Sequence, residues 1–259
     1  MSRRRALGQH FLRDPLVARA IVDALGPSRR DLVVEIGPGE GALTDVLAGR
    51  AGHVIALEID RELVERLRRR LPVVEIVEAD ARTWDYGLIA RPADGQALVA
   101  GNLPYSVGKP IVAALMAARR AIDRMVLMLQ REVAERLAAP PGSKVYGALS
   151  VLTQAVCDVE LTLRVPPGAF RPPPQVESAV VRVTPRAQSR VPEPLEARFR
   201  AVVRAAFASR RKMLANALAG GLGVPLATAR EAATACGVDP ARRAETLTIE
   251  EFVALTSRL

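Results

Sequence analysis

Cysteine and histidine are scarce in this sequence, and their scarcity removes two kinds of chemistry. The 259 residues include two cysteines, Cys157 and Cys236, and two histidines, His10 and His53. None of them has the paired spacing of a zinc site, and two cysteines cannot form the dense framework of a disulfide-stapled fold. We therefore expect no bound metal and a reaction that needs none.

Long apolar runs are also missing. No stretch approaches the roughly 20 residues that a membrane-spanning helix needs. The arginine-rich start, Arg3 to Arg5, leads into polar sequence and not into the apolar stretch of a signal peptide. Hydrophobic residues still make up 49% of the chain, which is enough for a buried core. The sequence predicts a globular cytoplasmic protein without membrane contact, and we expect a monomer.

Acidic residues are fewer than basic ones: 28 Asp and Glu against 37 Lys and Arg give a formal net charge of +9. Arginine supplies nearly all of the positive charge, so a GC-rich genome stays open as an alternative explanation. Between Arg182 and Lys212, however, nine residues are basic and two are acidic. Because basic side chains that neutralise phosphates release condensed counterions, this block indicates a nucleic-acid partner.

Short apolar runs alternate with helical patterns from about residue 31 to residue 130. The runs are LVVEI (32–36), HVIALEI (53–59), VVEIVEA (73–79), ALVAG (97–101) and RMVLMLQ (124–130). This alternation predicts a parallel sheet covered on both faces. Two further strands are expected at 158–165 and 178–183, and the proline-rich segment between them cannot be helical.

The composition changes after Thr184, and the remaining sequence is helical in pattern. Helices are expected near 195–208, 210–219, 226–235 and 249–258. We therefore predict an α/β domain over residues 1–187 with a mostly parallel sheet of about seven strands. A small all-helical domain should follow over residues 188–259, with the basic block at the junction.

A glycine-rich turn follows the first apolar run. LVVEI leads directly into Gly37, Gly39 and Gly41, and the second run ends in Glu58. Glycines let the backbone pass close to a ligand, and an acidic side chain at the end of the next strand can accept from both hydroxyls of a ribose. The pattern predicts a nucleoside-binding site at the carboxyl ends of parallel strands.

The spacing of this turn disfavours NAD. A dinucleotide site wants G-x-G-x-x-G, whereas this turn reads G-x-G-x-G and carries Glu40 where phosphates would lie. Glu35, before the glycines, suits a cationic ligand with an amino group, such as S-adenosylmethionine. Asp80, after the third run, can accept from an adenine amino group. The alternative that Glu58 and Asp80 only cap helices stays open.

A loop with an unneeded aromatic residue follows the fourth run: Asn102-Leu103-Pro104-Tyr105. Asparagine and proline are ordinary turn residues, but no turn requires the tyrosine. Together with VEIGPGEG, EADA, FRPPPQVESAVVR and FASRRKMLANAL, the GNLPY loop resembles the ribosomal RNA adenine dimethyltransferase family over nearly the whole chain. Within that family the likeness is greatest to the small-subunit enzymes, which dimethylate two adjacent adenosines in a hairpin near the 3′ end of the RNA.

The resemblance implies a Rossmann-like class I methyltransferase sheet, S-adenosylmethionine as cofactor and S-adenosylhomocysteine as product. It implies small-subunit rRNA within a pre-30S particle as the partner. The cofactor-binding residues it implies are His10, Leu12, Gly37, Gly39, Glu58, Ile59, Asp80, Ala81 and Asn102. His10 departs from the family pattern, which usually has asparagine there, so a contact through a side-chain amide does not carry over unchanged.

An adenine amine is a poor nucleophile because its lone pair is delocalised into the ring. The amide oxygen of Asn102 and the carbonyl of Leu103 offer two acceptors for the amino hydrogens, and Pro104 restricts the backbone of Leu103. Tyr105 and Phe170 can then stack on the two faces of a flipped adenine. The alternatives are that both aromatic residues belong to the core and that Asn102 is a helix cap.

Three other functions stay open. A large-subunit enzyme of the macrolide-resistance type shares this kind of loop, and a non-catalytic ribosome-assembly factor could keep the fold. A DNA adenine methyltransferase is disfavoured because it would want an acidic residue in place of Asn102. The basic residues Arg210, Arg211 and Lys212 are expected to bind RNA, with a solvated helix face as the alternative.

Overall fold

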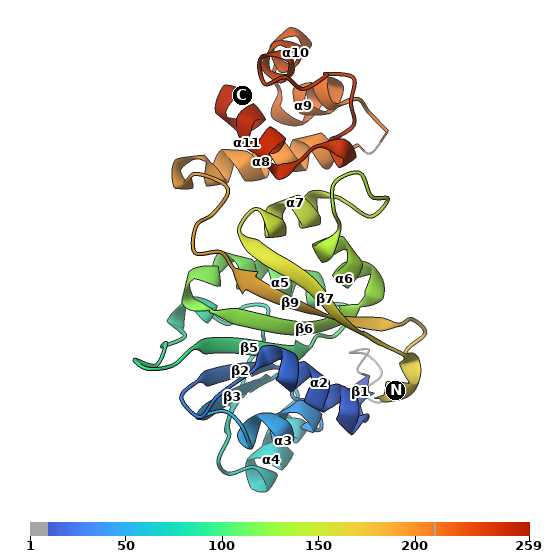
Figure 1. The fold of residues 1–259 in the computed structure, drawn as a ribbon. Coiled ribbons are helices and arrows are strands. Elements are labelled where there is room, and N and C mark those ends of the chain that lie inside the picture. Colours follow the sequence, from blue (N-terminus) through green and yellow to red (C-terminus); the bar gives the residue numbers. More distant parts are fainter. Residues whose placement is uncertain (1–9, 210) are drawn as a thin grey trace. The chain divides into compact units, whose positions relative to one another are not determined.

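The computed structural model describes residues 10–209 and 211–259 of the chain (Figure 1). These residues form two compact units. The described part of the first unit covers residues 10–134 and 160–185, and the second covers residues 135–159 with the described part of 186–259. Arg210, which was expected to bind RNA, lies outside the described residues.

A seven-stranded sheet runs through the first unit in the order β4-β3-β2-β5-β6-β9-β7 (Figure 1). Five strands pair in parallel, and β9 runs antiparallel to β6. The predicted α/β fold, a mostly parallel sheet of about seven strands, is therefore confirmed. The strands are β2 (Leu32–Ile36), β3 (His53–Glu58), β4 (Glu75–Glu78), β5 (Ala97–Asn102), β6 (Arg124–Gln130), β7 (Cys157–Val165) and β9 (Ser178–Pro185).

The central strand of the parallel part is β2, and its apolar sequence explains its place. All five of its residues are buried, and Val34 lies between Ile55 of β3 and Val99 of β5. Chain order reverses here, because β3 lies on one side of β2 and β5 on the other. Ligands of open α/β sheets bind at the carboxyl ends of the strands beside such a reversal.

Helices of the first unit pack their apolar faces on this sheet. The longest of them, α2, begins after Asp14, whose side chain accepts from the amide of Leu16 at 2.8 Å. Asp60 caps α4 in the same way. Ile21, Leu47 and Leu67 form one core with residues of the strands. These helices are α2 (Pro15–Leu25), α3 (Ala42–Ala48), α4 (Arg61–Arg70) and α5 (Gly108–Ala117).

The second unit is helical and has its own core, to which Tyr146, Val151, Phe199, Leu218 and Phe252 belong. Its last helix begins with a capping box, in which Thr248 and Glu251 satisfy each other's backbone amides. The remaining helices are α6 (Arg131–Ala138), which starts in the first unit, α7 (Ala148–Gln154), α8 (Glu196–Phe207), α9 (Leu214–Leu222), α10 (Leu226–Ala235) and α11 (Ile249–Arg258).

The division differs from the boundary expected at residue 187, because residues 135–159 also belong to the second unit. The helices α6 and α7 are absent from the expected set, and α7 joins the helical core through Val151. The helix expected at 210–219 runs instead from Leu214 to Leu222. Its buried side chains are Leu214, Ala215, Ala217 and Leu218, so packing fixes the later start.

A second, two-stranded sheet joins β1 (Phe11–Leu12) to β8 (Phe170–Arg171) in antiparallel register. Leu12 pairs with Phe170, and Phe11 pairs with Arg171. Short 3₁₀ helices complete the fold at Tyr86–Leu88, Arg119–Ala121, Pro167–Ala169, Glu193–Leu195 and Ala244–Thr246. Among the described residues, every helix is too short or too polar to cross a membrane.

Candidate active site

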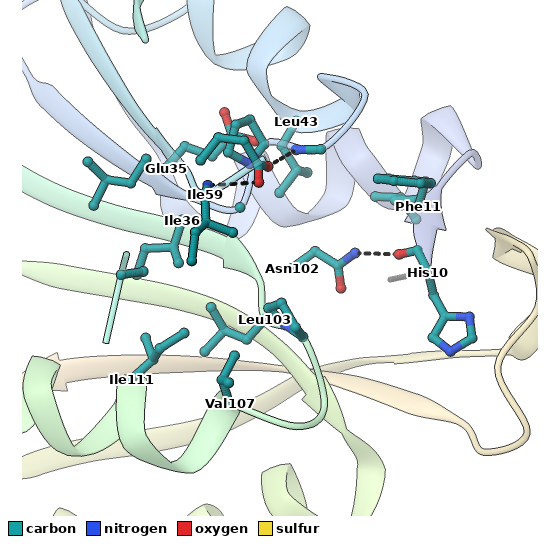
Figure 2. Close-up of a pocket in the computed structure, with 18 of the residues that line it drawn as sticks. His10, Phe11, Glu35, Ile36, Leu43, Ile59, Asn102, Leu103, Val107 and Ile111 are labelled. Atoms are coloured by element: carbon teal, nitrogen blue, oxygen red, sulfur yellow. Dashed lines mark hydrogen bonds between the residues drawn. The ribbon is translucent and has the colours of Figure 1, made fainter. Parts of the chain in front are cut away.

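A cavity of about 190 Å³ opens in the first unit, where the loops after β2, β3, β4 and β5 converge. In Figure 2, Asn102 lies between the N-terminal segment and the strand ends, with its amide directed at His10. The cavity brings together every predicted cofactor-binding and catalytic residue except Phe170: His10, Leu12, Gly37, Gly39, Glu58, Ile59, Asp80, Ala81, Asn102, Leu103, Pro104 and Tyr105.

The glycine turn forms one wall of the cavity and is fixed to the end of β3. The amide of Gly37 donates to the carbonyl of Leu57 at 2.9 Å. Gly39 has a φ of 57°, and a Cβ atom there would lie 2.9 Å from Cδ1 of Phe11. A side chain at Gly39 would therefore displace the Phe11 ring, which also lines the cavity.

Glu58 is held in place by backbone amides. Its carboxylate accepts from Gly39 at 3.1 Å, from Ile59 at 2.9 Å and from Asp60 at 3.0 Å. Burial raises the pKa of Glu58, and these three amides act in the opposite direction. The carboxylate is thus oriented before any ligand arrives. Its Oε2 atom accepts from Gly39 alone and keeps acceptor capacity for a hydroxyl group, whereas Oε1 already accepts from two amides.

Glu35 is the most buried ionisable group of the site. It is 1% exposed, and its Oε2 atom makes no hydrogen bond within the described part of the chain. Burial raises the pKa of Glu35 to about 8, with smaller contributions from Asp45 and Glu58. The Thr44 hydroxyl lies close enough to oppose this shift, although its Oγ1 atom also lacks a partner with hydrogen-bond geometry.

Glu35→Gln should change how stability depends on pH. The pKa is about 8 in the folded chain against an ordinary value of 4.5, so between these values the folded state holds a proton that the unfolded state lacks. The free energy of unfolding therefore falls as the pH rises through this window. The amide cannot ionise, so the variant should gain stability relative to the parent chain from about pH 5 to pH 8.

Urea midpoints of both chains at the two pH values measure this effect. Glu65→Gln, which changes an exposed carboxyl on α4, is the matched control and should follow the parent chain. If Glu35→Gln keeps the pH dependence of the parent chain, then Glu35 does not carry the proton.

Asp80 is ionised and forms an ion pair with a neighbouring arginine. Nε of Arg82 donates to both carboxylate oxygens at 3.0 Å, and this contact lowers the pKa of Asp80. Arg82 lines the cavity too, although no motif in the sequence marks it as a site residue. The role expected for Asp80, accepting from an adenine amino group, stays a prediction.

Asn102, at the end of β5, has a determined amide orientation. Its Nδ2 atom donates to the backbone carbonyl of His10 at 3.1 Å. A carbonyl only accepts, so the nitrogen of the amide must be the atom that faces His10. The Oδ1 atom is therefore left to accept from a ligand in the cavity (Figure 2).

Hydrogen bonds also hold the other residues of the loop 102–105 in place. The amide of Leu103 donates to Met128 on β6 at 3.0 Å, and the carbonyl of Pro104 accepts from Val107 at 3.1 Å. The Tyr105 hydroxyl shares a hydrogen bond of 2.7 Å with Ser178. Burial is the main cause of the raised pKa of Tyr105, so its phenol stays protonated at neutral pH.

Phe170 is the predicted residue that the structure does not bring to the cavity. It is 4% exposed and packs in the core of the first unit with Leu12 and Val180. Phe11, the neighbour of Leu12 on β1, lines the cavity instead. Successive residues of a strand point to opposite faces, and Phe170 pairs with Leu12, not with Phe11. A stacking role would require the Phe170 ring to leave the core.

The family model for ribosomal RNA adenine dimethylase matches residues 1–259. The chain belongs to this family. A "Ribosomal RNA small subunit methyltransferase A" of Geobacter sulfurreducens is 46% identical over 261 residues, which cover 99% of this chain and 95% of the relative. The protein of the same name from Xylella fastidiosa (strain 9a5c) is 41% identical over 257 residues, covering 98% and 95%.

Solved structures of two relatives share the fold of this dimethylase. A dimethyladenosine transferase from Plasmodium falciparum is 25% identical with a TM-score of 0.81, covering 95% of this chain and 96% of that one. The 23S rRNA methyltransferase ErmE is 28% identical with a TM-score of 0.75, covering 96% and 99%. A dimethyladenosine transferase and a 23S rRNA methyltransferase therefore both share the architecture of this chain.

Ion pairs engage four of the nine basic residues between Arg182 and Lys212 of this dimethylase. These four arginines pair with acidic residues: Arg182 with Glu160, Arg186 with Asp158, Arg190 with Glu250, and Arg200 with Glu196. Arg211 and Lys212 are exposed, and the described residues give neither an ion pair. These two side chains keep their charge available, while the structure leaves their predicted contact with RNA untested.

Proposed function

We propose that this dimethylase transfers methyl groups from S-adenosylmethionine to the N6 amines of two adjacent adenosines. These adenosines lie in a hairpin near the 3′ end of small-subunit (16S) rRNA, and the protein works as a cytoplasmic monomer on a pre-30S particle. The identity of 46% to a protein named for the small ribosomal subunit supports the substrate. The orientation of the Asn102 amide is the observation that carries the chemistry.

The residues of the cavity fit S-adenosylmethionine. Glu58 is oriented to accept from ribose hydroxyls, and Asp80 provides a carboxylate for an adenine amino group. Glu35 offers a buried oxygen without a partner, and an ammonium group beside it would favour its ionised form. Ile59 and Ala81 line the same cavity. When bound, the cofactor supplies a methyl group activated by its positive sulfur.

The loop prepares the adenine amine for attack. Asn102 Oδ1 and the carbonyl of Leu103 accept the two amino hydrogens, which turns the nitrogen lone pair toward the methyl carbon. Bound S-adenosylmethionine would supply the methyl group, and its sulfur would keep the electron pair of the carbon–sulfur bond that the attack breaks. The methylated nitrogen then releases one proton to water. Tyr105 stacks on the base, so catalysis consists mainly of positioning.

The decisive experiment offers labelled S-adenosylmethionine and undermethylated small and large ribosomal subunits to the purified chain. We expect label in the small-subunit RNA, on two adjacent adenosines as dimethyladenosine. Label in the large-subunit RNA would favour the macrolide-resistance type of enzyme. Tight binding to the small subunit without label would favour a non-catalytic assembly factor.

Arg210, Arg211 and Lys212 are proposed to bind RNA phosphates. Replacing all three with glutamine should lower the slope of log affinity for the RNA against log salt by roughly 2 to 3, since each phosphate contact contributes about 0.7 to 0.9. The matched control removes three charges that already have partners, by substituting Arg182, Arg190 and Arg200. Equal slopes for the two triple variants would contradict the proposal.

A further inference from the structure

Ser178 is a buried hydroxyl in an apolar strand. It is the first residue of β9, pairs with Gln130 of β6 and is 0% exposed. Ala179, Val180 and Val181, which follow it, are equally buried. Burying a hydroxyl costs free energy unless it is hydrogen-bonded. Within the described part of the chain, the Ser178 hydroxyl is hydrogen-bonded to that of Tyr105, at 2.7 Å.

His10 meets the same tyrosine from another direction. The two ring centroids are 5.6 Å apart and the planes are tilted by 35°. Nδ1 of His10 contacts the carbonyl of Pro172 at 2.8 Å, and because a carbonyl only accepts, Nδ1 carries the hydrogen. The segment 172–178 therefore supports Tyr105 from both of its ends. Pro172, at one end, binds His10, whose ring lies beside the Tyr105 ring, and Ser178, at the other end, binds the Tyr105 hydroxyl.

We propose that Ser178 is a positioning residue for methyl transfer, and that its hydroxyl fixes the position of the Tyr105 ring against which the target adenine stacks. The proposal rests on the proposed function, which gives Tyr105 the stacking role. Rotation about the first side-chain torsion of a tyrosine swings its phenol oxygen, so the hydrogen bond to Ser178 restricts that torsion. Rotation about the second torsion leaves the oxygen in place, and the neighbouring ring of His10, 5.6 Å away, limits it. The segment 172–178 thereby serves as a scaffold for the loop of residues 102–105.

The experiment compares Ser178→Ala, Tyr105→Phe and the double variant. Tyr105→Phe keeps the ring and removes the hydroxyl, so both single variants delete the same hydrogen bond. Each should lower kcat for methyl transfer to the small subunit by roughly three- to tenfold, the range of one buried neutral hydrogen bond. The double variant should be no slower than the slower single variant, because the bond is already absent.

Calorimetric affinity for S-adenosylmethionine should change less than twofold in all three variants, and Ser178→Thr should restore most of the rate. Thr162→Val is the control: Thr162 is an exposed residue of β7, and its Oγ1 atom donates to the carbonyl of Val180 on β9 at 3.2 Å. This control should keep the rate of the parent chain. It separates the contact with Tyr105 from a general loss of a hydroxyl beside β9.

Two results would overturn the proposal. In one, Ser178→Ala turns over at the rate of the parent chain. In the other, the losses of the two single variants multiply in the double variant, which means that the hydroxyls act independently. Tyr105→Phe alone keeps the proposal falsifiable if Ser178→Ala does not fold, since an unchanged rate there also overturns it. Failure of the proposed function looks different, because the parent chain itself would then methylate neither adenosine.

Discussion

Asn102→Ala should reduce methyl transfer roughly a hundredfold or more while leaving the affinity for S-adenosylmethionine nearly unchanged. The variant removes Oδ1, the acceptor that we assign to one amino hydrogen of adenine. It also removes the Nδ2 donor that holds the carbonyl of His10 at 3.1 Å. A misplacement of about 1 Å can cost this much in a reaction that depends on alignment. Single-turnover transfer of labelled methyl groups measures the rate, and calorimetry measures the affinity.

Asn102→Asp separates the two functions of the amide. Aspartate keeps an acceptor for the adenine amine but has no hydrogen to give to the carbonyl of His10. We expect it to be faster than Asn102→Ala and slower than the parent chain. If the alanine variant turns over within a few-fold of the parent chain, Asn102 is a structural cap and the assigned role is wrong.

Much of the cavity follows from sequence because parallel strands end at one edge of a sheet. The glycine turn after β2, Glu58 at the end of β3 and Asn102 at the end of β5 are each fixed by one strand and its following loop. Local patterns place these residues, and the sheet brings them together. For that reason the predicted site residues in the loops after β2, β3, β4 and β5 all line the cavity.

Contacts between distant segments escape such a prediction. Tyr105 and Ser178 are 73 positions apart, and His10 and Pro172 are 162 apart. Nothing in the local sequence states which hydroxyl will meet which ring. The strands β1 and β8 have two residues each, too few for a periodic pattern. Their register decides that Phe11 faces the cavity and that Phe170 faces the core, so the expectation for Phe170 had no local support.

Phe170→Ala should therefore act on stability. Phe170 is 4% exposed and packs in the same core as Leu12, Ala169 and Val180. Truncating a buried phenylalanine costs about 3–5 kcal/mol, because the apolar burial is lost and a cavity remains. The urea midpoint measured at neutral pH should fall accordingly, while Phe170→Leu, which keeps most of the volume, should lose less than about 1.5 kcal/mol.

Phe11→Ala is the counterpart at the cavity. Its ring is partly exposed, lines the cavity and lies against Gly39. It should lose much less stability than Phe170→Ala but should bind S-adenosylmethionine more weakly. The comparison also tests the stacking role expected for Phe170. The contrary result would be a Phe170→Ala variant that keeps the urea midpoint and the cofactor affinity of the parent chain but loses activity on RNA. The Phe170 ring would then leave the core and stack on the adenine during the reaction.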